Sequence, residues 1–462
     1  MFTARGALDK VFAALRARGL GLARLQGLHP AIDRAVRVAR RRHYTRRFFA
    51  DGPRRRGAPD GGTFVLFNHC YDLDIDAMCA ATTPHTLWVL DPFALFTDVH
   101  YFFPPNQRDL DAVYGKGEMR ASIERLKVAY IEAFARRLVD EVGIDALITP
   151  ADTFYYLRPL IEELAARGVP TIVQDKEGTI APSAIMDDHA RVLAERYPPI
   201  GDAYFFWNDT VREFWARVGL PPERARVLGQ PRSDFFFHPA RWPAKETLGL
   251  TAGKQLLVVF TYDSDVYLRV TEPLPDRPWK PMRDALHSMV HELARERPEL
   301  EIVVKAHPQQ AELAEVISEF AGAPPNVTVM TGAKSASHLL VHADAIIGFQ
   351  STVMIEAMLT GKPVIYAGWG EHHAQHAPSL IPIDRSGGVT LVADRADLAR
   401  LTRAALDGRL LPTAEERAAR KVFTDRYFFA ADGNVSARVL DAAAEVAATT
   451  RARSGSRPST RA

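Results

Sequence analysis

Two adjacent hydroxyl residues, Ser351 and Thr352, follow the apolar run Ala345–Phe349 at the point where a helical pattern begins. The apolar run predicts a buried strand, so the two residues stand where a strand passes directly into a helix. A helix N-terminus offers free backbone N–H groups and a positive dipole, which suit a phosphate group. We therefore expect Ser351 and Thr352 to bind the phosphates of a nucleotide. The alternative is simple N-capping of the helix, worth about 1 kcal/mol, and the two roles are compatible.

Lys305 and His307 close a second predicted strand, Glu301–Lys305. At the carboxyl edge of a parallel sheet, a lysine can neutralise a phosphate and a histidine can donate a hydrogen bond to one. For each residue the alternative is a structural role at the strand end. Glu356 lies one helical turn beyond Thr352, where its carboxylate could accept hydrogen bonds from two ribose hydroxyls. Its apolar neighbours argue against the alternative of an ordinary, solvent-exposed helix glutamate.

A general base is expected in the N-terminal half of the chain. The predicted strand Pro170–Gln174 ends just before Asp175 and Glu177, and Gly178 permits a tight turn after them. Glu177 is the first candidate for the group that takes a proton from an acceptor hydroxyl, and Asp175 is the second. A solvated, charged loop explains either residue alone equally well.

His69, Asp72 and Asp74 follow the first predicted strand of the chain. Alternating aspartates suggest a bound cation, but an EF-hand loop starting at Asp72 needs glycine at its sixth position and glutamate at its twelfth. Those positions hold Ala77 and Thr83. We expect the aspartates to cap a helix, and contact with an acceptor is the alternative for His69, Asp72 and Asp74.

Three histidines, His372, His373 and His376, lie beside Glu371. Imidazoles and a carboxylate in such proximity could hold zinc. Histidines in a loop near a substrate phosphate are the preferred interpretation, so no metal site is predicted. The individual roles of the three histidines stay open.

Twelve short apolar runs alternate with amphipathic segments and would position these residues. Strands that alternate with helices predict a parallel sheet covered on both faces. The predicted strands are Thr63–Phe67, Thr86–Leu90, Asp145–Thr149, Pro170–Gln174, Ala203–Trp207, Arg226–Leu228, Gln255–Thr261, Glu301–Lys305, Val327–Thr331, Ala345–Phe349, Pro363–Ala367 and Val389–Val392.

The chain has 462 residues, too many for one ordinary core, and the strands fall into two sets of similar size. We expect an α/β protein with two tandem Rossmann-like domains that face a cleft. The predicted divisions are a basic N-terminal helical segment at 1–62, a first domain at 63–240, a second domain at 241–450 and a disordered tail at 451–462.

The pairing of two Rossmann-like domains with these motifs resembles the GT-B glycosyltransferases. It is most similar to bacterial enzymes of surface carbohydrates, including the CDP-glycerol glycerophosphotransferases and the capsule Kdo transferases. In the second domain the matching residues are His307-Pro308, Ser351, Thr352, Glu356, Gly361 and Pro363. The stretch Gly229-Gln230-Pro231-Arg232-Ser233-Asp234 looks like the family's approach to the interdomain linker.

The resemblance implies a nucleotide-activated donor in the second domain, linked to CMP, CDP or UDP, and an acceptor in the first. It strengthens the ribose role of Glu356 and a functional role for His307. GT-B enzymes generally resemble one another in needing no bound metal, so no cofactor is expected.

Charge and cysteine content narrow the range of partners. The formal net charge is +2, which gives no general case for binding nucleic acid. Two cysteines in the whole chain suit a reducing cytoplasm. Ten arginines nevertheless crowd the stretch Arg34–Arg56, together with Tyr44, Phe48 and Phe49. They predict peripheral attachment to an anionic membrane surface, on its inner face, and a solvated helix is the alternative.

We therefore expect a cytoplasmic transferase that moves a sugar or a polyol phosphate from a nucleotide-activated donor to a surface-polysaccharide or lipid-linked acceptor. Two alternatives stay open. One is a nucleotide-sugar epimerase of the UDP-GlcNAc 2-epimerase type, and the other is a non-catalytic subunit that binds a nucleotide or a glycan.

Overall fold

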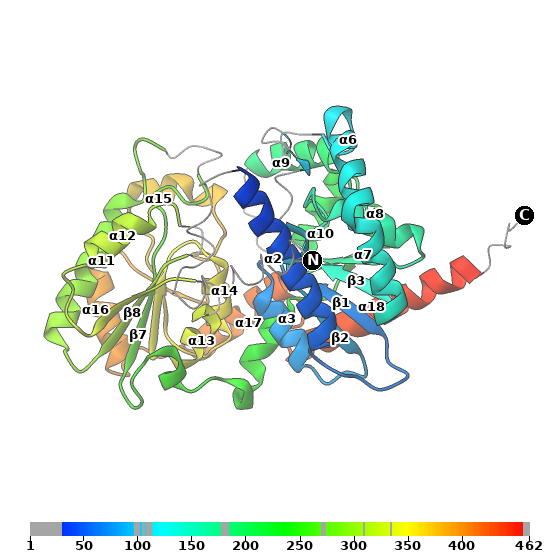
Figure 1. The fold of residues 1–462 in the computed structure, drawn as a ribbon. Helices are drawn as coiled ribbons and strands as arrows, with labels where there is room; N and C mark the ends of the chain where they lie inside the picture. Colours follow the sequence, from blue (N-terminus) through cyan, green and yellow to red (C-terminus); the bar gives the residue numbers. More distant parts are fainter. Residues whose placement is uncertain are drawn as a thin grey trace, which may run out of the picture.

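The computed structural model describes residues 30–96, 102–103, 107, 113–176, 184–268, 274–307, 310–332 and 335–455. Glu177, Gly178 and Pro308, which the sequence singles out, lie outside these ranges. The described residues form two lobes, each built around one sheet (Figure 1).

The first lobe contains a six-stranded sheet with the order β2-β1-β3-β4-β5-β6, and all of its pairs are parallel. Val65 and Phe67 of β1 point into one hydrophobic cluster, whereas Phe64 and Leu66 point into another. Both faces are therefore buried, which explains why the strands read as continuous apolar runs. The strands are β1 Thr63–Phe67, β2 Thr86–Leu90, β3 Ala146–Thr149, β4 Thr171–Gln174, β5 Ala203–Phe206 and β6 Ala225–Val227.

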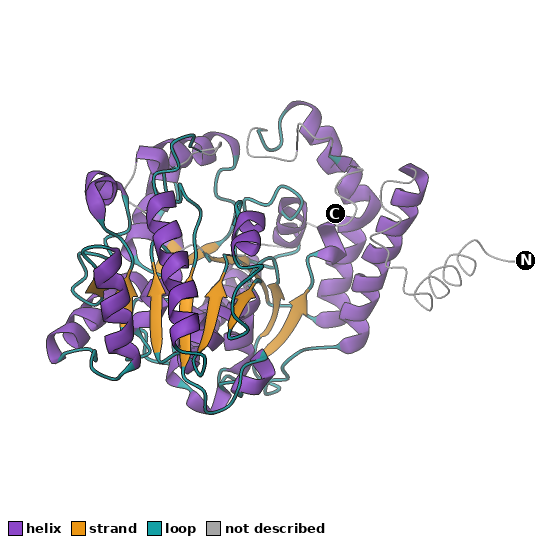
Figure 2. Cartoon of the chain, turned by 90° about the vertical axis from the view of Figure 1, so that its left-hand side faces the viewer, coloured by secondary structure: helices purple, strands orange, loops and turns teal. Residues whose placement is uncertain are grey.

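The second lobe has the order β12-β11-β10-β7-β8-β9, again with parallel pairs only. Helices lie in front of and behind its strands (Figure 2). The strands are β7 Leu256–Phe260, β8 Glu301–Lys305, β9 Val327–Met330, β10 Ala345–Gly348, β11 Val364–Tyr366 and β12 Thr390–Leu391. Every strand expected from the sequence is present, and the predicted α/β fold is confirmed.

The helices of the first lobe include a long one that changes pitch along its length. It starts as α6, passes through a π-helical turn (η3) into α7 and ends in a second π-helical turn (η4). The elements are α2 Pro30–Asp51, α3 Asp72–Ala80, α4 Phe93–Phe96, α6 Gly117–Leu126, η3 Lys127–Ile131, α7 Glu132–Arg137, η4 Leu138–Val142, α8 Arg158–Ala166, α9 Ala184–Arg196 and α10 Asp209–Val218.

A 3-10 helix, η5 Pro222–Arg224, lies just before β6 in the first lobe. Three more carry the chain between the lobes, namely η6 Pro231–Phe237, η7 Pro239–Arg241 and η8 Lys245–Leu248. The second lobe then contributes α11 Lys280–Glu296, α12 Leu313–Glu319, α13 Ser335–His342, α14 Thr352–Met358, α15 Gly370–His376, η9 Ala377–Ser379, α16 Arg395–Leu406 and α17 Ala414–Phe428.

The last helix, α18 (Val435–Gly455), returns to the first lobe. Val439, Leu440 and Ala443 lie in the same cluster as Phe64 and Leu66 of β1. The sequence division placed this helix in the second domain at 241–450 and expected disorder from residue 451. In the structure α18 continues to Gly455, and its apolar stripe between Val435 and Ala447 covers one face of the first sheet. Helical periodicity predicts such a stripe but does not say which sheet it covers.

The basic helix α2 packs against the first lobe rather than standing apart from it. Val36 and Phe48 are buried, and Tyr44 and Phe49 pack against the core. These aromatic side chains therefore face the protein, which corrects the expectation that they could enter a lipid interface. An amphipathic helix shows the same periodicity whether its apolar face packs on a membrane or on a protein core. Here the face packs on the core, where Phe48 contacts the ring of Trp88.

Candidate active site

The side chain of Lys305 lies at the carboxyl end of β8 and is buried. Its Nζ donates to the carbonyl of Ala306 at 2.6 Å, and within the described ranges no carboxylate lies within ion-pair distance. Burial lowers the pKa of Lys305 to about 8. A buried ammonium group without a paired carboxylate is suited to an anionic partner such as a phosphate.

His307 is exposed two residues further on, in the loop that leads to α12. Its backbone N–H donates to Oε1 of Gln310 at 3.3 Å. The far end of this loop is fixed by Asp263, whose carboxylate accepts the backbone N–H groups of Ala311 at 3.1 Å and Glu312 at 3.0 Å. Asp263 thus anchors the loop that carries His307.

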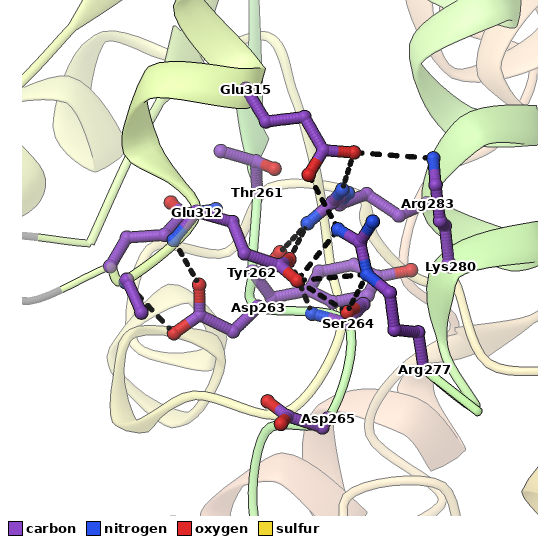
Figure 3. Close-up of polar contacts among 12 residues, drawn as sticks. Thr261, Tyr262, Asp263, Ser264, Asp265, Arg277, Lys280, Arg283, Glu312 and Glu315 are labelled. Atoms are coloured by element: carbon purple, nitrogen blue, oxygen red, sulfur yellow. Dashed lines mark hydrogen bonds and ion pairs between the residues drawn. The ribbon is translucent and has the colours of Figure 1, made fainter. Parts of the chain in front are cut away.

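A group of charged side chains lies at the same carboxyl edge of the second sheet (Figure 3). We call this group the Glu312 network; its members are Arg277, Lys280, Arg283, Glu312 and Glu315. Glu312 accepts from Nη2 of Arg277 at 2.7 Å and also pairs with Arg283, which is fully buried. Glu315 pairs with Arg283 at 3.0 Å and Lys280 at 3.3 Å. The network ties α11 to α12.

The contacts of the Glu312 network lower the pKa of the Glu312 carboxyl group. Burial alone would raise the pKa of this carboxyl group, but hydrogen bonds from Ser264, the charge of Arg283 and a hydrogen bond from Arg277 outweigh it and lower the pKa to about 2. Ser264 belongs to the loop after β7 and donates through both its N–H, at 2.8 Å, and its hydroxyl, at 2.6 Å. Sequence reasoning did not find this network, because its members are far apart along the chain and match no motif.

Ser351 is the N-cap of α14, and its hydroxyl accepts the N–H of Val353 at 3.4 Å. Thr352 begins the helix and is half-buried. The predicted strand-to-helix junction is present, together with the capping role that the sequence offered as its alternative. The preceding residue, Gln350, is buried and fixes the main chain of Ile381 through two hydrogen bonds of 3.0 Å.

Glu356 does not stand open at the junction. Its side chain is only 5% exposed, and both carboxylate oxygens have protein partners. Oε1 accepts from Nε of Arg232 at 3.0 Å, and Oε2 accepts from the hydroxyl of Ser337 at 3.2 Å. Arg232 also contacts Asp74, whose side chain is 1% exposed, at 3.5 Å. The structure therefore brings Glu356 and Asp74 together at the boundary between the lobes.

At the carboxyl edge of the first sheet, His69 is half-buried after β1 and packs 4.5 Å from the ring of Phe154. Its Nδ1 lies 3.0 Å from the hydroxyl of Tyr156. Burial, and next the positive charge of Lys176, lower the pKa of His69. The imidazole is therefore neutral at neutral pH, and Lys176 at the end of β4 is its electrostatic neighbour.

Asp175 is also buried at this edge, where its Oδ2 accepts from the indole N–H of Trp215 at 2.6 Å. Asp72 is the first residue of α3 and accepts from the side-chain amide of Asn68 at 3.0 Å. The N-cap of α3 is Tyr71, which makes no side-chain capping hydrogen bond, so the expectation that the aspartates cap the helix is wrong and they lie inside its first turn. Asp74 instead pairs with Arg232 at the boundary between the lobes. Glu177 lies outside the described residues.

The three histidines after β11 lie on the short helix α15, which corrects the expectation of a loop, and their surroundings differ. His373 is buried and its Nε2 lies 3.2 Å from the hydroxyl of Tyr366, while burial lowers its pKa. His376 meets the ring of Trp279 edge-on, and His372 is exposed. In the part of the chain that the structure describes, no group of three or more His, Cys, Asp and Glu side chains is arranged to hold a metal ion.

Several solved structures are similar to this chain. A UDP-GlcNAc 2-epimerase from Neisseria meningitidis bound to UDP-GlcNAc is 11% identical, with a TM-score of 0.45 over 83% of this chain and 100% of the other. Another UDP-N-acetylglucosamine 2-epimerase is 12% identical, with a TM-score of 0.48 over 84% and 95%. The enzyme from Rickettsia bellii is 14% identical, with a TM-score of 0.40 over 84% and 97%. Nothing about the activity of this chain follows from similarities at this level.

No match was found among curated protein sequences. The model of one protein family, however, matches residues 202–445, more than half of the chain. The matched region contains the linker, the Glu312 network, Lys305 and the Ser351–Thr352 junction. The chain belongs to the CDP-glycerol:poly(glycerophosphate) glycerophosphotransferase family.

Proposed function

We propose that this protein transfers glycerophosphate from CDP-glycerol to a hydroxyl group at the end of a growing poly(glycerophosphate) chain. The family match over residues 202–445 carries this proposal. It covers the whole donor side, from the linker to the end of the second sheet, and leaves most of the first sheet outside. The donor is therefore better supported than the acceptor.

In the proposed reaction the acceptor hydroxyl oxygen attacks the phosphorus that bears glycerol. A new phosphorus–oxygen bond forms there, and the bond from that phosphorus to the bridging oxygen of the diphosphate breaks. CMP leaves with the bridging oxygen and its electron pair, and the hydroxyl proton passes to a base. Most of the catalysis in such a transfer comes from positioning and from stabilising charge on the phosphates.

Lys305 is the group we propose to balance the charge that builds up on the departing CMP. Its ammonium has no carboxylate partner within the described ranges, so a phosphate would not have to displace one. Ser351 and Thr352 would hold a phosphate at the start of α14, and His307 would donate to another phosphate oxygen. The Glu312 network keeps the loop after β8 in place for this purpose.

The base is proposed to come from the carboxyl edge of the first sheet. Asp175 is bonded to Trp215 and buried, which makes it a support for its loop rather than an open acceptor. Glu177 and His69 therefore remain as candidates. If Nδ1–H of His69 donates to Tyr156, its Nε2 is free to take a proton; the other tautomer would make Nε2 a donor to substrate.

Transfer is tested with purified protein, CDP-glycerol and a poly(glycerophosphate) primer, by following CMP release and primer lengthening. Thermal unfolding with CMP, CDP, UDP and GDP ranks the donor nucleotide, because a ligand at a hundred times its Kd stabilises by about 2.7 kcal/mol. Cytidine nucleotides should give the largest shift, and EDTA should leave transfer unchanged.

Two outcomes would overturn the proposal. Conversion of UDP-GlcNAc without any acceptor would show an epimerase instead. Nucleotide binding without release of CMP from CDP-glycerol, with any acceptor offered, would show a binding subunit. Glu177→Gln and His69→Asn, compared over a range of pH, identify which residue produces the acidic limb of the rate profile.

We further propose that α2 brings the protein to an anionic membrane surface by charge alone. Arg42, Arg46 and Arg56 are exposed and have no ion pair with any described residue. Other arginines of the stretch form ion pairs within the protein, as Arg47 does with Asp51 at 2.8 Å and Arg54 with Asp76 at 2.6 Å. Among the described residues no helix is both long enough and apolar enough to cross a bilayer.

A further inference from the structure

Arg232 is the point at which the two lobes meet through charged groups. Its backbone N–H donates to Oδ1 of Asp74 at 3.2 Å, and its Nη1 lies 3.5 Å from Oδ2. Its Nε donates to Oε1 of Glu356 at 3.0 Å, and its guanidinium lies 4.5 Å from the ring centre of Trp207. We call Asp74, Arg232 and Glu356 the interdomain bridge.

The three residues of the bridge belong to elements next to the two halves of the candidate active site. Asp74 is in α3, which begins just after His69 at the edge of the first sheet. Glu356 is in α14, which begins at the Ser351–Thr352 junction. Arg232 is in η6, which packs on α3, α13 and α18. One guanidinium therefore connects the helix of the proposed phosphate site with the helix of the acceptor-side edge.

The backbone around Arg232 is held as firmly as its side chain. Asp234 accepts the N–H groups of Val435 at 2.8 Å and Ser436 at 2.7 Å, where α18 begins. Gly229 has φ of +100°, and a side chain there would come within 2.6 Å of the carbonyl of Phe429. The chain passes between the lobes twice, once near Asp234 and once near Val435, and the two segments contact each other beside Arg232. These contacts give the bridge a fixed support at the point where the chain crosses between the lobes.

We propose that Arg232 is a positioning residue that sets the separation between donor and acceptor in the transfer reaction. A rotation of one lobe against the other must change its distance to Asp74 or to Glu356, because these lie on different lobes. The same contacts assign Glu356 to the bridge and not to the ribose, since both of its oxygens already have protein partners. This inference rests on the proposed function only in naming what is positioned.

The first experiment compares the full-length protein with Arg232→Lys, which keeps the charge but cannot span both carboxylates. We expect kcat for transfer from CDP-glycerol to fall about 10- to 100-fold, because a small misplacement of reacting groups has effects of this size. The Kd of CDP should change less than about twofold. Arg403→Lys is the control, since this exposed arginine pairs with Glu296 inside the second lobe.

A loss of CDP affinity as large as the loss of kcat would make Arg232 a donor-binding residue and overturn the inference. Unchanged kcat would overturn it as well. Glu356→Gln approaches the bridge from the other side and keeps the shape of the side chain. It should affect CDP and pyrophosphate affinity equally, whereas a selective loss for CDP would place Glu356 on the ribose and contradict the bridge.

A second readout needs no substrate, and so separates this inference from the proposed function. Backbone hydrogen exchange is measured in α3 and α14 for the wild type, Arg232→Lys and Arg403→Lys. Exchange should rise in both helices together in Arg232→Lys alone. A rise in only one helix, or in neither, would contradict the bridge even if CDP-glycerol proves to be the donor. A rise in both would support it even if the wild type transfers nothing.

Discussion

The Glu312 network and the interdomain bridge both hold an arginine against two carboxylates, but they differ in how many cations each carboxylate contacts. In the network, Arg277, Lys280 and Arg283 face Glu312 and Glu315 inside one lobe. In the bridge, one guanidinium serves two buried carboxylates that come from different lobes.

The pKa values follow this difference. That of Glu312 is lowered to about 2, whereas that of Asp74 is raised to about 6, mainly by burial, with Arg232 opposing and Glu356 adding to the rise. Glu312 pairs with two arginines and accepts from Ser264, so it stays ionised and the network is a fixed scaffold behind the donor site. Asp74 and Glu356 share one arginine, so the strength of the bridge depends on the protonation of Asp74.

The largest expected effect comes from breaking the network. Glu312→Gln removes one of the two carboxylates that pair closely with the fully buried Arg283 and leaves Glu315 at 3.0 Å, so we expect a loss of about 3 kcal/mol in the free energy of unfolding. Denaturant titration measures it. Glu315→Gln is the matched control, because Glu315 is one-third exposed and should lose less. Equal losses of unfolding free energy in the two variants would show that the greater burial of Glu312 makes no difference to stability.

The second prediction concerns the slope of stability against pH. The folded pKa of Asp74 is above its unfolded value of 3.8, so its stabilising contribution is complete below that pH and is lost as the pH rises through about 6. Relative to Asp74→Asn, the wild type should lose about 3 kcal/mol over this window. Glu312 has the opposite shift, so its contribution should be lost as the pH falls below 4.5. Denaturant titrations of both variants between pH 3 and pH 8 measure the two slopes, and slopes of the same sign would contradict the comparison.

The third prediction tests whether the scaffold serves a nucleotide. Ser351→Ala combined with Thr352→Ala should raise the Kd of CDP about tenfold, because two hydroxyl contacts to phosphate are lost. The free energy of unfolding should fall by only about 1 kcal/mol through the lost cap. Calorimetric titration gives the Kd. Binding equal to that of the wild type would show that the nucleotide lies elsewhere.

The last prediction concerns a region far from both clusters, helix α2. Arg42→Glu with Arg46→Glu should weaken sedimentation with phosphatidylglycerol vesicles at low salt, by about 1 kcal/mol for each arginine lost. Deleting the helix is not a clean test, because Phe48 is part of the core. Arg409→Glu on the second lobe controls for net charge. If neither the double substitution nor added salt reduces sedimentation with the vesicles, an electrostatic contact is ruled out.

The sequence was sufficient for the repeating pattern of the fold. Strands such as Glu301–Lys305 were predicted with correct ends, because a strand buried on both faces requires an uninterrupted apolar run. The Ser351 junction was predicted for a similar reason, since capping is local chemistry within a few residues. Family membership also rests on such local motifs, and the match to residues 202–445 bears out the resemblance to glycerophosphotransferases.

Only the tertiary structure decided what lies across from each of these residues. Asp74 and Glu356 are 282 positions apart, and neither periodicity nor a motif indicates that Arg232 joins them. The same holds for α18, whose apolar stripe fits either sheet by pattern alone and was assigned to the wrong one. Local sequence fixes backbone conformation through short-range sterics and hydrogen bonds. Partners at long range are fixed by the complementarity of whole surfaces, which exists only after the chain has folded.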